Sequence, residues 1–593
     1  MRLKFIIPFL LSASLTFAQT IPSSRIVDWT HAGYPDSIPN PNLIFDVTNF
    51  GAIGDSIFDN TNAIRNAIDS LHGARGVIYF PPGNYIIGST IDLADSVILR
   101  GVSSDSTRLI FNLQGAVGNG FNILGSVSGI FAVVLSGTER GSNSIVVNDP
   151  SSFSLGDFCE LVQDNGAWDS QPVSWANNSV GQILRLTSIS GDTLFFNSAL
   201  RLDYDTSLNL RIQKIIPAHE VGIECLQISR TDSVLVGVCI NIYYNYAANC
   251  WIKGVESSLS IGSHIEMDAS TNITISGSYI HHCFEYNGTS THGYGITFFA
   301  HTGQCLVTNN IMRHLRHSFS FQTGANGNVL SYNYSIDPNR SESPSNLGAD
   351  ISLHGHYPFA NLFEGNIVQN IQIDQTWGPS GPFNTFFRNR AELYGILMTS
   401  GTIQSDSLNF VGNEVPNTGF LLGNYVLAGT AHFEYGNNIR GTITPVGTTV
   451  LPDTSYYLNN PPPFWTAFPF PSIGMPNVFN TGSIPARDRY LSGVNLTVCE
   501  ESIFNSINTF DENPHLIYPN PSAGKVTING LTGRDNVLIG IKDLSGMTVL
   551  NKTLSILKGE VTLEFPAAFT NGIYVLSVTC GKSTFASKIV LLK

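Results

Sequence analysis

Histidine, the side chain best suited to moving protons near neutral pH, is unevenly spread along this chain of 593 residues. Eight of the 14 histidines lie between positions 281 and 356, although only 12% of all residues are charged. The stretch ISLHGHYPFANLFEGNI (351–367) places His354 and His356 one glycine apart. This clustering predicts acid–base chemistry in the middle of the chain.

The neighbours of His354 follow from the alternation of a β-strand, in which every second side chain faces the core. Five short runs align by their inward apolar pairs: HIEMD (264–268), ITFF (296–299), FSFQ (319–322), ISLH (351–354) and IQID (371–374). The alignment places Gln322, His354 and Asp374 side by side on the outer face, on strands about 4.8 Å apart. We therefore expect the Asp374 carboxylate to orient the His354 ring. His356, beyond the strand, is expected to be a turn residue or a substrate contact.

A repeat of asparagine marks the strands that must carry these residues. Segments such as NVLSYN, NLFEGN and NTFFRN, with close relatives, end at positions 277, 310, 333, 366, 389, 413 and 437. The spacing is 23 or 24 residues, apart from two steps of 33. This period predicts an all-β fold, a right-handed parallel β-helix with rungs of about 23 residues. Asn361 and Asn366 are then ladder residues that bond the equivalent asparagine one rung away. For His281 and His314, each four residues past a ladder position, the alternative to chemistry is that they stack on each other at a turn.

The segment 45–93 resembles the N-terminal cap and first coils of the pectate-lyase-like superfamily. The matching features are FGAIGD, the amphipathic stretch DNTNAIRNAID and the strand and turn VIYFPPGNYII. In physical terms, Asp59 or Asn60 caps a helix with one apolar face, which closes the end of a hydrophobic column. The resemblance implies a β-helix over 40–480. Because most of the resembling families act on polysaccharides, it also implies a polysaccharide substrate.

Both ends of the chain look like export signals. Residues 1–19 have two early cations, an apolar middle and a small residue near the end, the layout of a secretory signal peptide. YPNPSAGKVTINGL (518–531) and FTNGIYVLSVTCGKSTFASKIVLLK (569–593) resemble the C-terminal sorting domain of type IX secretion. Short alternating strands predict a small β-sandwich over 517–593, after a polar linker at 481–516. The resemblance implies that the secretion machinery is a partner and that the protein passes through the periplasm to the cell surface or the medium.

Residues 137–215 lose the asparagine repeat and contain short strands, which indicates either a small β insertion or a set of irregular coils. The loop DNGAWDSQPVSWA (164–176) carries Trp168 and Trp175. These two rings could stack on sugars, or they could pack inside the loop and stabilise it.

Composition argues against several other classes of function. The net charge of −14, with 30 lysines and arginines, gives no basic footprint for nucleic acid. No stretch after the first 20 residues approaches 18 apolar residues, so we expect no membrane span.

The cysteines show no metal-binding spacing and no cofactor is predicted, although Glu266 and Asp268 could supply oxygen ligands to Ca²⁺. Cysteine pairs could form between Cys225 and Cys239 or Cys283 and Cys305, the alternative being buried free thiols. We expect a monomer.

The resemblance favours a lyase that cleaves an acidic polysaccharide by β-elimination. Such an enzyme needs a base near the C5 proton of the sugar, a cation that neutralises the carboxylate and an acid for the leaving oxygen. We expect His354 to be the base, Asp374 to orient it, and Arg316 or Arg340 to be the neutralising cation. Further substrate contacts are expected from Gln322, His292, His317, His356, Arg388, Trp168 and Trp175.

Two alternatives stay open. A glycoside hydrolase needs two carboxylates about 5 to 9.5 Å apart, whereas the alignment separates Asp374 from Asp268 by four rungs, about 19 Å. A loop acid such as Asp350 or Glu285 would then have to take part, and the polygalacturonase pattern of NTD, DD and GHG followed by RIK is absent. A non-catalytic glycan-binding or surface protein would depend more on Trp168 and Trp175 than on the histidines.

Overall fold

The computed structural model describes residues 20–233, 239–466, 469–499, 517–529, 536–542, 548–556, 560–567, 569–580 and 583–592. The chain divides into two compact units, 1–499 and 500–593, and each is described by itself. The predicted signal peptide at 1–19 and residues 500–516 of the predicted linker lie outside the described residues.

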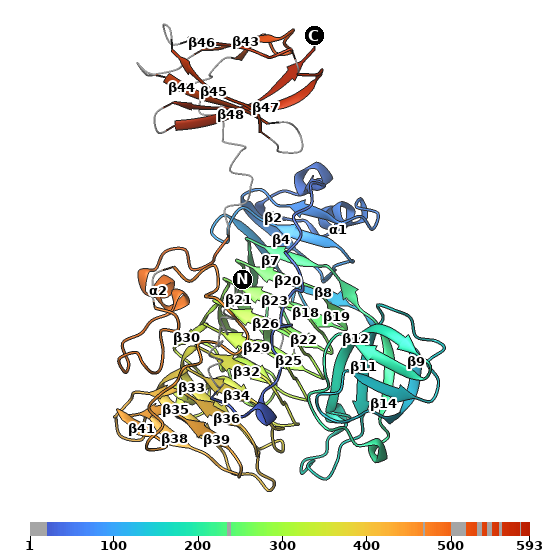
Figure 1. The fold of residues 1–593 in the computed structure, drawn as a ribbon, viewed down its shortest axis with the longest axis vertical. Coiled ribbons are helices and arrows are strands. Elements are labelled where there is room, and N and C mark those ends of the chain that lie inside the picture. The colour runs from blue at the N-terminus through green and yellow to red at the C-terminus, as the bar shows by residue number, and fades with distance from the viewer. Residues whose placement is uncertain are drawn as a thin grey trace, which may run out of the picture. The chain divides into compact units, whose positions relative to one another are not determined.

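The first unit is a stack of coils whose strands form three parallel ribbons, which confirms the predicted parallel β-helix (Figure 1). One ribbon is a separate sheet of 12 strands. Its members are β1 (Ile44–Asp46), β3 (Gly76–Tyr79), β6 (Val97–Arg100), β16 (Gly222–Glu224), β20 (Trp251–Lys253), β23 (Thr274–Ser276), β26 (Leu306–Thr308), β29 (Val329–Ser331), β32 (Leu362–Glu364), β34 (Thr385–Phe387), β36 (Asn409–Val411) and β39 (Phe433–Tyr435).

The other two ribbons are joined into one sheet because β33 (Ile367–Ile373) and β35 (Arg390–Met398) run through both. The first ribbon contains β2 (Asp55–Asp59), β4 (Gly83–Ile87), β7 (Thr107–Phe111), β17 (Gln227–Arg230), β21 (Glu256–Ser260), β24 (Tyr279–Cys283), β27 (Ile311–Arg313), β30 (Tyr334–Ile336), β37 (Glu414–Val415), β40 (Asn437–Ile439) and β41 (Thr442–Thr444). The second ribbon contains β5 (Ile91–Asp92), β8 (Phe121–Leu124), β18 (Ile242–Asn245), β22 (Ser263–Asp268), β25 (Tyr294–Phe299), β28 (His317–Phe321), β31 (Ala349–Leu353) and β38 (Asn424–Val426). A two-stranded pair, β15 (Ala218–His219) and β19 (Ala247–Ala248), lies at a turn.

Two asparagine ladders hold the corners on either side of the 12-stranded sheet. In each, the backbone N–H and the Nδ2 of one asparagine donate to Oδ1 of the next, at 2.9 to 3.2 Å. One ladder runs Asn310, Asn333, Asn366, Asn389, Asn413, Asn437, and the other runs Asn328, Asn361, Asn384. Every member is fully buried. The predicted roles of Asn361 and Asn366 are confirmed.

Helix α1 (Thr61–Asp69) closes the first coils, as the resemblance implied. Asn60 holds the N-cap position without a side-chain cap bond, and Asp59 Oδ1 accepts a hydrogen bond from the Thr61 backbone N–H at 3.0 Å where the helix begins. The apolar face of the helix, which includes Ile64 and Ala67, is buried in the same core as the coil interior. The cap therefore prevents the end of the apolar column from being exposed to water.

Residues 126–216 form a closed antiparallel barrel beside the coil stack, drawn in cyan to green in Figure 1. Its strands are β9 (Ser126–Ser136), β10 (Ser144–Val147), β11 (Phe158–Gln163), β12 (Val180–Ser190), β13 (Thr193–Phe196) and β14 (Arg211–Ile216). The barrel is the β insertion expected from the loss of the repeat, and it begins at Ser126 rather than at 137. Arg201 Nη1 donates to Asn326 Oδ1 at 2.7 Å, which fastens the barrel to a coil turn.

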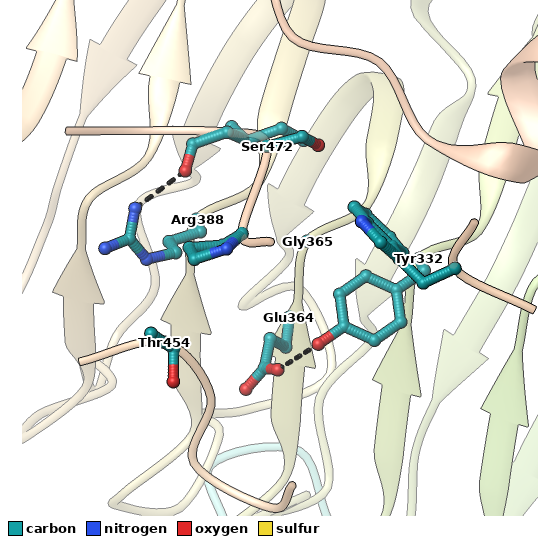
Figure 2. A pocket seen from close by; sticks show the side chains of 9 residues that line it. Tyr332, Glu364, Gly365, Arg388, Thr454 and Ser472 are labelled. Atoms are coloured by element: carbon teal, nitrogen blue, oxygen red, sulfur yellow. Dashed lines mark hydrogen bonds between the residues drawn. The ribbon is translucent and has the colours of Figure 1, made fainter. Parts of the chain in front are cut away.

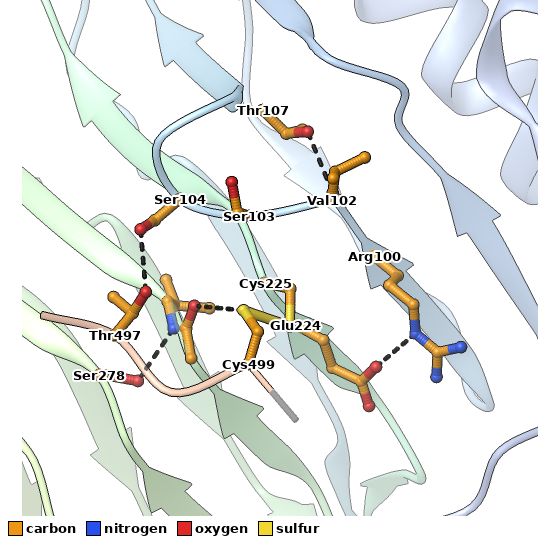
Figure 3. The surroundings of a disulfide bond; sticks show 12 residues. Arg100, Val102, Ser103, Ser104, Thr107, Glu224, Cys225, Ser278, Thr497 and Cys499 are labelled. Atoms are coloured by element: carbon orange, nitrogen blue, oxygen red, sulfur yellow. Dashed lines mark hydrogen bonds and ion pairs between the residues drawn. A yellow bond between two sulfur atoms is a disulfide. The ribbon is translucent and has the colours of Figure 1, made fainter. Parts of the chain in front are cut away.

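Residues 481–499 belong to the first unit, so the prediction that the linker begins at 481 is wrong. They include helix α2 (Pro485–Ser492), whose Arg489 donates to Asn309 Oδ1 at 2.6 Å. Cys499 forms a disulfide with Cys225, 274 residues away, beside the Arg100–Glu224 ion pair (Figure 3). The polar composition of this segment resembles a linker, but these bonds hold it against the coils.

Neither of the two cysteine pairs considered possible is formed. Cys225 is bonded to Cys499, and the remaining candidates, Cys239, Cys283 and Cys305, are buried free thiols. Buried thiols are therefore the correct reading for those three residues.

The second unit consists of two antiparallel sheets that share one apolar core, which confirms the predicted β-sandwich. One sheet contains β42 (Ile517–Tyr518), β43 (Lys525–Asn529) and β46 (Glu560–Glu564). The other contains β44 (Asn536–Lys542), β45 (Thr548–Ser555), β47 (Gly572–Cys580) and β48 (Ser583–Leu591). Throughout the described part of the chain, no helix is both long and apolar enough to cross a membrane.

Candidate active site

The second ribbon presents the predicted column of polar side chains on its outer face. Ser320, Ser352 and Gln372 are aligned across β28, β31 and β33, so the residues two positions further along are aligned as well. His354 Nδ1 lies 2.9 Å from Asp374 Oδ2, and Gln322 Nε2 donates to the His354 carbonyl at 3.0 Å. The structure therefore places His354 between Gln322 and Asp374, as expected.

Asp374 is held in its ionised form. Burial would raise the pKa of Asp374, but its contacts with His354 and with both the hydroxyl and the backbone N–H of Thr376 outweigh burial and hold the pKa below its usual range. Nδ1 of His354 faces the carboxylate at 2.9 Å, although the contact does not have the geometry of a well-formed hydrogen bond. An ionised Asp374 stabilises positive charge on His354 when that ring takes up a proton.

A neutral histidine, His317, lies next to this pair. Its ring centroid is 5.4 Å from that of His354, and its Nδ1 is 3.2 Å from the Ala349 carbonyl, to which it donates. Burial, the charge of Arg316 and the nearby His354 lower the pKa of His317 well below its usual value. The neutral ring with Nδ1 protonated has a lone pair at Nε2, and no described side chain is bonded to that atom.

Tyr294 and Arg316 complete the cluster. Tyr294 is the rung neighbour of His317, and their ring centroids are 4.7 Å apart in an edge-to-face contact. The Arg316 guanidinium lies over the Tyr294 ring at 5.5 Å, and its Nη1 donates to the Ser290 carbonyl at 3.3 Å. Burial raises the pKa of Tyr294, while Arg316 opposes that shift. A cation, a phenol and two imidazoles thus gather on one face.

The sequence alignment did not include Tyr294. The strand ITFF was aligned from Ile296, whereas β25 begins at Tyr294, directly after the loop at 284–293. Extending the alignment backwards to pair Tyr294 with His317 would have found this residue.

Strand β28, which begins at His317, and strand β31, which ends just before His354, also carry two buried hydroxyls. Ser320 and Ser352 lie in adjacent rungs, and neither Oγ atom has a hydrogen-bond partner among the described residues. An unpaired buried hydroxyl is costly. Water or a sugar hydroxyl would satisfy both groups.

Two carboxyl groups lie further along the same face, at Glu266 and Asp268 of β22. Burial raises the pKa of Glu266 to about 7, although Ser263 Oγ donates to it at 3.0 Å. Burial and the charge of Glu160 also raise the pKa of Asp268. Residues two apart in a strand are about 7 Å apart on one face. The sequence interpretation considered Glu266 and Asp268 as Ca²⁺ ligands but not as the two acids of a hydrolase.

Several predicted contacts lie elsewhere. Arg340 bonds the carbonyls of Pro344 and Ser343 within its own loop, and His292 bonds Asn287. Neither contacts the column. Arg313 and Asp337 lie on the first ribbon with His281 and His314.

Arg388 corrects another expectation. It is 1% exposed and donates to the carbonyls of Leu451, Asp453, Ile473 and Met475, next to a small pocket that also holds Glu364 and Tyr332 (Figure 2). Residues 451–453 and 473–475 therefore surround the guanidinium, and Arg388 is a structural residue rather than a substrate contact on the second ribbon.

Asp350 also faces inward. It is 1% exposed and accepts hydrogen bonds from Ser335 and from the backbone of Gln369 and Asn370. It therefore cannot serve as the loop acid of a hydrolase.

The histidines expected to stack do so with other partners. His282 stacks on His314 with ring centroids 4.8 Å apart, and His281 stacks on Tyr279 at 4.2 Å. Glu256 and Asp337 lie within 3.2 Å of His281 and His314, respectively. These rings are on the first ribbon, apart from the column.

The tryptophans have different environments. Trp168 packs on Tyr357 at 4.6 Å, while Trp175 is 55% exposed and contacts His356 at 4.7 Å and Trp377 at 5.9 Å. His356 is fully buried, and neither ring nitrogen has a partner among the described residues. Trp377 was not anticipated, because it follows the last residue of the aligned strand.

Among the described residues, no group of three or more histidine, cysteine, aspartate or glutamate side chains could hold a metal ion. Glu266 and Asp268 are only two such ligands.

Comparison with known proteins gives two family matches. Residues 44–127 match the family described as rhamnogalacturonase A/epimerase, pectate lyase-like, and residues 516–592 match the secretion system C-terminal sorting domain. Mannuronan C5-epimerase AlgE6 of Azotobacter vinelandii is 37% identical over 71 residues, which span 11% of this chain and only 8% of the epimerase.

Matching solved structures include the tailspike protein gp49 of Pseudomonas phage LKA1, which is 14% identical with a TM-score of 0.41 over 66% of this chain and 77% of the tailspike. The A-module of the same epimerase is 14% identical with a TM-score of 0.34, over 67% of this chain and 98% of the module. An exopolygalacturonase from Thermotoga maritima is 11% identical with a TM-score of 0.36, over 64% of this chain and 82% of the exopolygalacturonase.

The two family matches agree with the resemblances found at both ends of the chain. The chain carries a pectate-lyase-like segment at the start of its β-helix and ends in a secretion system sorting domain, which indicates export to the cell surface or the medium.

Proposed function

We propose that this protein is a secreted polysaccharide lyase that cleaves an acidic polysaccharide by β-elimination. The observation that carries the proposal is the cluster on the second ribbon, in which Arg316, Tyr294 and the Asp374-oriented His354 gather around the neutral His317. These groups match the three requirements of the reaction, a cation, an acid and a base.

The reaction can be assigned to side chains. Arg316 binds the uronate carboxylate and stabilises the negative charge that develops when C5 loses its proton. Nε2 of His354 takes that proton, and the resulting imidazolium is stabilised by Asp374. The electron pair from the C5–H bond forms the C4–C5 double bond, the C4–O bond breaks, and the Tyr294 hydroxyl donates its proton to the leaving oxygen. His317, through Nε2, accepts a hydrogen bond from a sugar hydroxyl.

The name of a curated relative points to the same carbon of the sugar as the first step of this assignment. A mannuronan C5-epimerase, as its name states, inverts C5 of a uronate, which requires breaking the same C5–H bond. A lyase and an epimerase differ in the next step, because the lyase expels the C4 substituent and the epimerase returns a proton to the opposite face.

A glycoside hydrolase is the second candidate, favoured by one observation. Glu266, with a pKa of about 7, and Asp268 lie on one face of β22, at a separation of about 7 Å along the strand. Inverting hydrolases pair a protonated acid with an ionised base at about 6.5 to 9.5 Å. Within the described part of the chain, the hydrogen bonds of this pair involve no arginine or lysine that would bind a uronate carboxylate, so the column around His354 fits the acidic polymer better.

A screen of acidic and neutral polysaccharides separates the candidates. Polygalacturonate, alginate, hyaluronate and dextran are incubated with the protein, and absorbance at 235 nm and reducing ends are followed. A lyase gives both signals, a hydrolase gives reducing ends alone, and a binding protein gives neither. Arg316→Gln should lower the absorbance rate by about 10²-fold or more, whereas Arg313→Gln, on the first ribbon, should leave it unchanged. Equal activity of the two variants would refute the role of Arg316.

A further inference from the structure

The barrel and the coil stack enclose a pocket that the proposed reaction does not use. It encloses about 190 Å³ and is lined by Trp175, Arg211 and Gln213 of the barrel and by Tyr246, His301 and Thr323 of the coil turns. An aromatic wall beside a few polar groups suits a sugar ring, which has apolar faces and polar edges.

The pocket continues the outer face of the second ribbon. Thr323 directly follows Gln322 of the column, and Thr323 Oγ1 accepts a hydrogen bond from the backbone N–H of Ala300 at 2.7 Å. The pocket therefore begins one residue past the column.

The walls of the pocket are fixed in place. His301 Nδ1 lies 2.7 Å from Glu160 Oε1 of the barrel, and its Nε2 lies 2.7 Å from the Asn178 carbonyl. Gln213 Nε2 donates to the other oxygen of Glu160 at 2.6 Å. Because the two His301 contacts cross from the barrel to the coil turn, little order would have to be gained on binding.

Trp175 is exposed but rigidly supported. More than half of its surface is open to water, and its ring is held by edge contacts with His356 and Trp377. Trp168, on the same loop, packs on Tyr357 and anchors the loop instead. An exposed indole leaves apolar surface uncovered, at a cost that stacking on the apolar face of a pyranose ring would remove.

Two polar groups near Trp175 lack full partners. The buried His356 ring that contacts Trp175 has neither nitrogen bonded among the described residues. Arg211 has one ion pair at 3.4 Å with Asp164 and one bond at 3.2 Å to the Asn209 carbonyl, both through Nη1. Nε and Nη2 of Arg211 are therefore available for a carboxylate.

We propose that this pocket is a saccharide subsite in which Trp175 stacks on a pyranose ring and Arg211 pairs with the carboxylate of a uronate. The inference rests on the proposed function in one respect, because the ligand is taken to be the same acidic polysaccharide. It makes the barrel a part of the substrate-binding surface.

Affinity electrophoresis of the full chain tests the subsite without using turnover. Native gels contain polygalacturonate, alginate, hyaluronate or dextran, and retardation is measured for the wild type and for Trp175→Ala, Arg211→Gln, Phe131→Ala and Arg185→Gln. Phe131 is 63% exposed and Arg185 is exposed on the same barrel, so they are matched controls. At least one acidic polymer, and not dextran, should retard the wild type. Trp175→Ala and Arg211→Gln should each raise the dissociation constant by about tenfold or more, about 1.4 kcal/mol, and the controls should not.

The result separates the subsite from the lyase. If Trp175→Ala and Arg211→Gln bind as the wild type does, or if no acidic polymer retards the wild type, the subsite is refuted, whatever the absorbance at 235 nm shows. If the two variants lose retardation but no polymer yields unsaturated products, the subsite is supported and the proposed lyase activity is refuted. Trp175→Phe keeps an aromatic face, so it should recover most of the binding and show that loss in Trp175→Ala does not reflect misfolding; equal loss in both variants would count against stacking.

Discussion

At the scale of single residues, the site depends on pairs whose members affect each other's charge. Asp374 keeps its charge because His354 and Thr376 contact it, and that charge prepares His354 to take a proton. His317 is kept neutral by burial and by Arg316. The difference between the two histidines comes from their neighbours, since both lie on the same face.

His354→Ala should lower turnover by about 10² to 10⁴-fold with little change in stability, because its ring is on the outer face and is the proposed base. Leu353→Ala, the adjacent inward residue, should instead lower the free energy of unfolding by about 2 to 5 kcal/mol, since Leu353 is fully buried in the core. Urea denaturation and 235 nm rates distinguish the two. If the His354→Ala protein is fully active, or is as unstable as Leu353→Ala, the catalytic role of His354 is contradicted.

The raised pKa of Glu266 implies that the stability of the protein depends on pH. Its pKa is about 7 in the folded protein and 4.5 ordinarily, so the folded state holds the proton more tightly than the unfolded state does. The stability that Glu266 contributes is complete below about pH 4.5 and is lost as pH rises through 7. Glu266→Gln should therefore match the wild type near pH 5 and be more stable by on the order of 2 kcal/mol at pH 8.

Urea midpoints at both pH values check this prediction, with Glu285→Gln in an exposed loop as the control. If the free energies of unfolding of Glu266→Gln and the wild type differ by the same amount at pH 5 and pH 8, the pKa of Glu266 is not raised in the folded protein.

At the scale of elements, the asparagine ladders set the register on which the column depends. Asn366 Nδ2 donates to Asn389 Oδ1 and to the Leu330 carbonyl, and Asn366 Oδ1 accepts from Asn333. Asn366→Ala leaves these buried groups unpaired and should lower the free energy of unfolding by about 1 to 3 kcal/mol. Asn112→Ala, at an exposed position, should cost much less. An unchanged melting temperature for Asn366→Ala would contradict the role of the ladder.

The column could be predicted from the sequence because two local periods determine it. The alternation of the strand decides that Leu353 is buried and His354 is not, and the asparagine spacing decides which rungs are adjacent. Both periods are visible in the order of residues, so the contact between His354 and Asp374 could be expected without a structure.

The rest of the site could not be predicted because it depends on segments that meet only in the folded chain. The loop at 284–293 hides the alignment of Tyr294 with His317. Arg388 is polar and was expected outside, but residues 451–453 and 473–475 surround it and supply carbonyls for its donors. No local period indicates where the barrel docks, so the pocket at Trp175 could not be anticipated.

At the scale of the whole molecule, the two units have separate cores and separate tasks. The apolar core of the β-sandwich draws only on residues of the second unit, and the coil stack has its own core. Removing residues 517–593 should therefore leave a folded β-helix that is no longer exported. Cell fractionation should find the shortened protein in the periplasm and the full chain on the surface or in the medium. Normal export of the shortened protein would contradict the sorting role of the tail.

The central claim is that this protein removes the C5 proton of a uronate and expels the C4 substituent. Proton NMR of polygalacturonate, alginate and hyaluronate, each treated with the full chain in D₂O, tests it most directly. For at least one polymer, the account predicts the olefinic H4 signal of an unsaturated uronate, absent with His354→Ala. Deuterium at C5 without that signal would indicate an epimerase and contradict the elimination. New reducing ends with C5–H intact, or no change in any polymer, would contradict the proton abstraction itself.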